Sequence, residues 1–176
     1  MVAKLEEIQL AFTRMQDEHD AYITGCRNAV QSLREDFAAY LNVPPSNVFF
    51  VDSVTLEQSA AYGTIDVPKP HNDAYDAGDF DEGGWYRIGL SFGLSASGET
   101  IPCWYPIMSL RLKRNSNGFV AQLGDSEDEF DLDPLVPSTI RPLSEEIANR
   151  MIDSAKQSSN NLLSGRRTKE CGFHVR

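Results

Sequence analysis

The apolar positions of the first forty residues recur at intervals of three and four. The first members of this stripe are Leu5, Ile8, Phe12, Met15, His19 and Tyr22, and it continues with one irregular step through Cys26, Val30, Leu33, Phe37 and Tyr40. Such intervals place side chains on one face of a helix, as in the buried seam between packed helices. The pattern therefore predicts a long amphipathic helix that needs a covering surface.

Two prolines and one glycine bear on the length of this helix. Pro44 and Pro45 cannot continue it, and Pro44 disfavours the α conformation at Val43, so we expect the helix to end near residues 41–42. Gly25 is a weak point, because glycine in a helix interior costs roughly 1 kcal/mol relative to alanine. The helix could divide there into a helical hairpin that keeps the same apolar face.

Alternating apolar positions predict strands in the middle of the chain. Residues 47–52 form a short apolar run between turn formers, and from Trp85 large apolar side chains alternate with small ones. Asn117-Gly118 is a hairpin signal between two further alternating segments, and residues 130–132 suit a short last strand. The order predicts an antiparallel β-meander of four to five strands.

A second helix is predicted near the end of the chain. Ser144 suits an N-cap, with Glu145 and Glu146 in the first turn, and Ser164-Gly165 suits the end. Its apolar side would pack on the sheet, which makes the fold class α+β. We expect an N-terminal helical interaction segment (1–42), an α+β domain (43–164) and a basic flexible tail (165–176).

The net charge of −10 is spread unevenly. Residues 1–50 carry a net −3, residues 51–134 a net −10 and residues 135–176 a net +3. An acidic body repels phosphates, so direct nucleic-acid binding is disfavoured. The acidic surfaces would suit a basic protein partner or an imitation of nucleic acid, although acidic surfaces also serve solubility alone.

The segment from residue 66 to residue 84 has the composition of a loop and gathers carboxylates. Four of them, together with His71, form a candidate site for Ca²⁺ or Mg²⁺: Asp73, Asp76, Asp79 and Asp81. The EF-hand pattern fails, because Gly83 occupies the position of the third ligand. A solvated acidic loop is the simpler explanation of the composition, so the metal site stands as an alternative.

No catalytic or cofactor signature is present. There is no G-x-S-x-G elbow, phosphate-binding loop or dinucleotide fingerprint, and Cys26, Cys103 and Cys171 are too dispersed for a zinc site. No apolar run reaches the roughly 20 residues that cross a bilayer, and acidic residues interrupt the opening segment. We expect no cofactor, no membrane association and a cytoplasmic location.

These features predict a non-catalytic intracellular protein-interaction subunit, such as an accessory, adaptor or immunity-type protein. The interaction surface would be the stripe from Leu5 to Tyr22, which binds a protein partner or a second copy of the chain in a homo-oligomer. One alternative is a metal-dependent enzyme or metal sensor centred on residues 71–82. A second alternative is an acidic nucleic-acid mimic.

Overall fold

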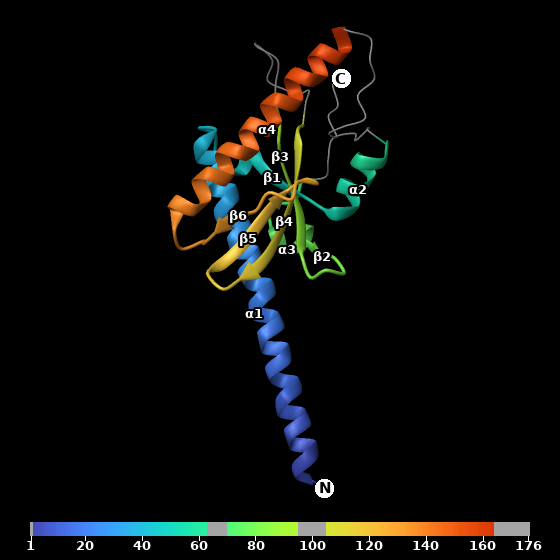
Figure 1. Ribbon diagram of the computed structural model, residues 1–176, viewed down its shortest axis with the longest axis vertical. Helices are drawn as coiled ribbons and strands as arrows, with labels where there is room; N and C mark the ends of the chain where they lie inside the picture. The colour runs from blue at the N-terminus through green and yellow to red at the C-terminus, as the bar shows by residue number, and fades with distance from the viewer. Residues whose placement is uncertain (1, 63–69, 95–104, 164–176) are drawn as a thin grey trace.

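The computed structural model describes residues 2–62, 70–94 and 105–163, and it confirms the α+β class (Figure 1). The helices are α1 (Val2–Tyr40), a 3-10 turn (Pro45–Asn47), α2 (Ser53–Tyr62), α3 (Ala74–Ala77) and α4 (Pro137–Leu163). The strands are β1 (Val48–Val51), β2 (Asp79–Phe80), β3 (Tyr86–Phe92), β4 (Ile107–Asn115), β5 (Gly118–Leu123) and β6 (Phe130–Leu132).

The strands form one antiparallel sheet in the order β1-β3-β4-β5-β6. Strand β2 pairs with the first two residues of β3, on the edge of β3 that β1 also occupies. Strands β3 to β6 follow one another as the predicted meander. The β4–β5 hairpin is confirmed, and Asn115 pairs with Gly118, so that Ser116 and Asn117 form the turn. Gly118 has a φ of 139°, a backbone conformation that residues other than glycine rarely adopt.

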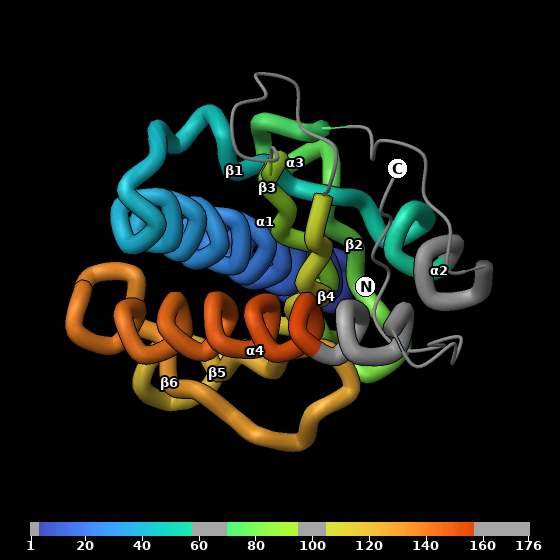
Figure 2. Tube along the Cα trace, turned by 90° about the horizontal axis from the view of Figure 1, so that it is seen from above, coloured from blue at the N-terminus to red at the C-terminus, as the bar shows by residue number. Residues whose placement is uncertain are grey.

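Helices α1 and α4 lie side by side on one face of the sheet (Figure 2). The alternating apolar residues of β3 and β4 point at these helices, because period-2 alternation directs every second side chain to the same face. The largest side chains in this core are Leu33, Phe37, Phe50, Tyr86, Ile88, Leu90, Leu110, Leu112, Leu123, Leu132, Leu143 and Ile147.

The other face of β3 is covered by α2. A Cβ atom on Gly89 would lie 2.9 Å from Cδ2 of Leu56 in α2 and 3.0 Å from Cβ of Val51 in β1. Glycine at this position therefore permits the close approach of α2 to the sheet.

Helix α1 is continuous through Gly25, so the alternative of a helical hairpin is wrong. A Cβ atom on Gly25 would lie 2.8 Å from Cζ of Phe119 in β5, which is nearly buried. The glycine is thus a site of close helix–sheet packing rather than a break, and the contacts of the surrounding turns outweigh its low helix propensity.

Alanine at Gly25 is expected to lower the free energy of unfolding by about 1 kcal/mol. Overpacking against the Phe119 ring costs about 1–3 kcal/mol, which exceeds the roughly 1 kcal/mol gained in helix propensity. Urea unfolding of Gly25→Ala measures the change. In a Phe119→Leu background, where the ring is gone, the same substitution should be neutral or stabilising; a loss of equal size in both backgrounds would contradict the packing explanation.

Helix α4 begins at Pro137, seven residues before the predicted start, so the assignment of Ser144 as an N-cap is wrong. Ser144 is fully buried, and its hydroxyl donates to Oδ2 of Asp36 in α1 at 2.7 Å. Arg141 contacts Oδ1 of the same carboxylate at 3.0 Å. The polar side chains that resembled a helix start therefore join α4 to α1, and the helix extends back through Pro142.

The segment 66–84 is only partly a loop. Asp73 is the N-cap of the short helix α3, where its carboxylate accepts a hydrogen bond from the amide of Tyr75 at 2.8 Å, and β2 follows directly. Residues 66–69 and the predicted basic tail (165–176) lie outside the described residues.

Candidate functional site

Helix α1 divides into a buried half and a projecting half. From Cys26 to Ala38 its inner face is part of the core that it shares with the sheet and α4. Residues 4–21 are all exposed, and Figure 1 shows this part of the helix extending away from the body. Packing supplies most of the stability of helices in proteins, and this part of α1, roughly 27 Å long, receives little packing from the described residues.

The projecting half carries four large apolar side chains on one face. Leu5 is 57% exposed, Ile8 66%, Phe12 53% and Met15 57%. Their spacing of three and four residues aligns them along the helix. We call these four residues the exposed stripe; the described part of the chain does not cover them.

His19 and Tyr22, predicted as members of the same interaction surface, lie at the border with the body. The Tyr22 ring packs against Phe80 of β2 at a centroid distance of 5.5 Å, and its hydroxyl donates to the carbonyl of Gly84 at 2.8 Å. His19 is exposed and its ring lies 6.4 Å from Phe80. Tyr22 therefore packs against its own chain, and the free surface does not extend to Tyr22 as predicted.

The exposed stripe and the buried face are one continuous face of α1. Seven-residue steps lead from Leu5 through Phe12 and His19 to Cys26, which is completely buried. Burial raises the pKa of the Cys26 thiol to about 11, so the group is a protonated core residue at neutral pH. The exposed stripe is therefore on the same side of α1 as the later residues of this helix that pack against the sheet.

The four candidate metal ligands have separate roles. Asp73 caps α3, and Asp76 lies exposed in the first turn of that helix. Asp79 accepts a hydrogen bond from Ser53 at 2.6 Å and contacts Arg87 of β3 at 3.3 Å. Asp81 contacts Arg111 of β4 at 2.9 Å.

Two of these carboxylates therefore neutralise arginines on the outer face of the sheet. Within the described ranges, no three His, Cys, Asp or Glu side chains are grouped in a way that would hold a metal ion. The geometry of the residues that the structure describes does not support the metal alternative.

Asp81 organises the turn between β2 and β3. Its Oδ1 accepts from the amides of Gly83 and Trp85 at 2.9 and 3.0 Å, and its Oδ2 accepts from Arg111. Burial acts to raise the pKa of this carboxyl, but the hydrogen bonds from Trp85, Arg111 and Gly83 prevail and hold the pKa below its ordinary value. The ionised form is thus stabilised by folding.

Asparagine at Asp81 is expected to lower the free energy of unfolding at pH 7 by about 1–2 kcal/mol. Because the folded pKa is depressed, the carboxylate stabilises the fold above pH ~4, and this contribution disappears as the pH falls through the folded pKa. Urea unfolding at pH 7 and pH 3 should show a smaller difference from wild type at pH 3. Asp76→Asn, which removes an exposed charge, is the control; equal losses at both pH values for Asp81→Asn would contradict the assignment.

The segment 125–133 is rich in acidic residues and contains the edge strand β6. Leu132 points into the core, while Asp131 is exposed and accepts a hydrogen bond from Asn115 at 3.3 Å. Asp128 contacts Arg150 of α4 at 3.3 Å. This arrangement is that of a charged sheet edge, which hinders pairing with other strands.

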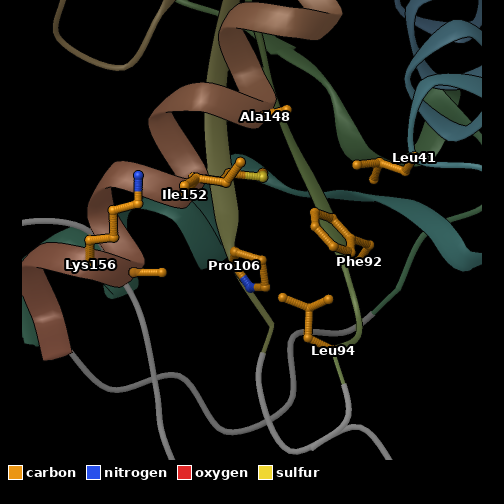
Figure 3. Close-up of a pocket in the computed structure, with 9 residues that line it drawn as sticks. Leu41, Phe92, Leu94, Pro106, Ala148, Ile152 and Lys156 are labelled. Atoms are coloured by element: carbon orange, nitrogen blue, oxygen red, sulfur yellow. The ribbon is translucent and has the colours of Figure 1, made fainter. Parts of the chain in front are cut away.

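A separate hollow of about 250 Å³ lies where α4, the end of α1 and the ends of β3 and β4 meet (Figure 3). Its lining is apolar except for Lys156 and consists of Leu41, Phe92, Leu94, Pro106, Ala148, Met151, Ile152, Ala155 and Lys156. The described residues of this lining include no acid–base pair or nucleophile, so they supply no catalytic group. Sequence patterns did not indicate it, because its walls come from four separate elements.

Among the described helices, none combines the length and apolar content needed to span a membrane. Comparisons with protein-family models, curated proteins and solved structures found no match for this chain. The projecting helix with its exposed stripe is therefore the candidate functional site on geometric grounds alone.

Proposed function

We propose that this chain is a non-catalytic, intracellular protein-interaction subunit of the accessory, adaptor or immunity type, whose binding element is the projecting half of α1. One observation carries the proposal: four large apolar side chains, more than half exposed, are aligned on a helix that extends from the body. Scattered apolar side chains on a surface are ordinary, but an aligned row on an otherwise unsupported helix indicates a contact surface.

The energetics favour a reversible contact. Two faces of this kind would bury eight large side chains, each contributing roughly 1–2 kcal/mol once its present partial burial is counted. Loss of translational and rotational freedom costs about 4 kcal/mol or more. The difference between the free energy of burial and the cost of association corresponds to a dissociation constant in about the micromolar range.

Charge would influence the rate at which a partner approaches. The projecting half carries five acidic and two basic residues (Lys4 and Arg14), and the whole chain has a net charge of −10. At low salt a basic partner would approach faster than an acidic one. At physiological salt this difference in rate is largely screened, so an acidic partner that matches the exposed stripe can also bind.

The proposal is tested by photo-crosslinking in the cells that produce the protein. A benzoylphenylalanine side chain in place of Phe12, within the exposed stripe, should give covalent adducts with whatever protein covers the stripe. The matched control is the same side chain at Leu10, which is 63% exposed on the opposite face of the helix. Absence of adducts at Phe12, or equal yields at both positions, would refute the proposal.

A further inference from the structure

We propose that the exposed stripe is covered by the same stripe of a second copy of this chain, with the two α1 helices antiparallel about a two-fold axis near residue 10. The inference rests on the proposed function and names its partner and geometry. A two-fold axis requires a self-complementary surface, and the exposed stripe satisfies this requirement in one register.

The direction of the body relative to the stripe excludes a parallel pair. The stripe points to the side of α1 on which the sheet covers Cys26, Ala29 and Leu33. In a parallel pair this face of each helix would lie along the axis, and each sheet would occupy the space of the other copy. In an antiparallel pair the bodies stand at opposite ends.

The antiparallel register follows from the stripe itself. In this packing the core residues that face each other have numbers that add to 20, whereas the flanking pairs add to 22 on one side of the core and to 18 on the other. Leu5 then faces Met15 of the second copy, and Ile8 faces Phe12 of the second copy. The two-fold axis repeats both contacts, giving four consecutive layers of apolar side chains with the single large ring of each copy opposite an isoleucine.

The residues that flank these layers are complementary as well. On one side Lys4 faces Glu18 of the second copy, and on the other Gln9 faces Gln9 of the second copy. Within the described part of the chain, neither Lys4 nor Glu18 forms an ion pair with its own chain. The axis again doubles the charged contact, so the pair contains two opposite-charge contacts and no like-charge contact at these flanking positions.

This register keeps the core contacts clear of the body, and the next one does not. In the proposed pair Leu5 lies opposite Met15, seven residues before Tyr22. Shifting by one heptad would place Leu5 against Tyr22, whose ring and hydroxyl already contact Phe80 and Gly84. The two Tyr22 residues stand about 36 Å apart along the helix axis, which separates the two acidic bodies.

Charge reversal tests the register. Lys4→Glu and Glu18→Lys should each weaken dimerisation roughly tenfold, because each replaces two attractive contacts with two repulsive ones. The double variant Lys4→Glu/Glu18→Lys restores both attractive contacts and should dimerise within about threefold of wild type. Sedimentation equilibrium measures the dissociation constants, and circular dichroism checks that the variants keep their helix content.

Cross-linking tests the direction. With Cys103 and Cys171 replaced by serine and the fully buried Cys26 left in place, a cysteine introduced at Ala11 lies beside its own copy across the two-fold axis and should form a disulfide-linked dimer under mild oxidation. A cysteine at Thr13, on the outer side of the pair, should not. A dimer that cross-links through Thr13 and not Ala11, or that ignores both charge reversals, would overturn the antiparallel register.

The inference and the proposed function fail in different ways. If the wild-type chain stays monomeric at millimolar concentration while the photo-crosslinker at Phe12 captures a different protein, self-pairing is refuted and the interaction function stands. If no adduct forms at Phe12 and the chain is monomeric, both are refuted. Adducts with the mass of two copies, together with rescue by the double charge reversal, support both.

Discussion

Aspartate in place of Ile8 is expected to weaken association of the chain about 100-fold or more, whereas aspartate in place of Leu10 should change it only slightly. The two positions are matched: Ile8 is 66% exposed, Leu10 is 63% exposed, and both lie in the projecting half of α1. They differ only in the face of the helix that carries them. The comparison therefore isolates the exposed stripe from any general effect of a new charge on the helix.

The size of the effect follows from the contact that is lost. Each Ile8→Asp substitution removes about 1.5–2 kcal/mol of apolar burial and places a carboxylate in the contact, which costs further free energy unless it is paired. A total loss of about 3 kcal/mol corresponds to a factor of about 100 in the dissociation constant. In a two-fold pair the substitution occurs twice, so a larger loss is expected there.

The measurement is sedimentation velocity over a concentration series, with circular dichroism as a check on helix content. Both variants introduce the same residue into the same helix, so any loss of helicity should be shared. Equal weakening by Ile8→Asp and Leu10→Asp would show that the stripe has no special role. No weakening by either would show that the projecting helix is not the contact surface.

Alanine in place of Phe37 is expected to lower the free energy of unfolding by about 3–5 kcal/mol, whereas alanine in place of Phe12 should leave it nearly unchanged in the monomer. Phe37 is fully buried in the core and meets the ring of Phe92 edge-on at a centroid distance of 5.8 Å. Its truncation removes apolar burial and leaves a cavity. Phe12 is 53% exposed, so little packing within the chain is lost.

Urea unfolding at a protein concentration well below the dissociation constant makes this comparison, because association would otherwise add to the stability of the wild type. Both substitutions change the same residue type in the same helix. Similar losses at the two positions would mean that the projecting half is packed as firmly as the buried half. A loss at Phe12 that appears only at high protein concentration would instead support association through the stripe.

Local patterns in the sequence determined most of the architecture. The alternation from Tyr86 to Leu90 and the turn formers around Asn117 specify strands and a hairpin through backbone geometry alone. The prolines at 44 and 45 end α1, which stops at Tyr40. These features depend on neighbours along the chain, so they are visible without the fold.

Features that depend on distant partners were missed or misassigned. Ser144 resembles an N-cap by its local context, but its hydroxyl binds Asp36, which lies 108 residues earlier. Gly25 resembles a helix break, but it lies within a continuous helix where Phe119 of β5 packs closely against it. The sequence also did not show that the carboxylates of Asp79 and Asp81, the alternative metal ligands, pair with arginines on β3 and β4. In each case the deciding contact joins segments far apart in the sequence.

The candidate site illustrates the same division. Periodicity determined that α1 has one apolar face from Leu5 to Phe37, because intervals of three and four residues match the helical repeat. Only the tertiary structure decided where along this face the chain's own sheet ends and the exposed stripe begins. The repeat is the same in both halves of the helix, and burial depends on how far the rest of the fold reaches, which no local pattern records.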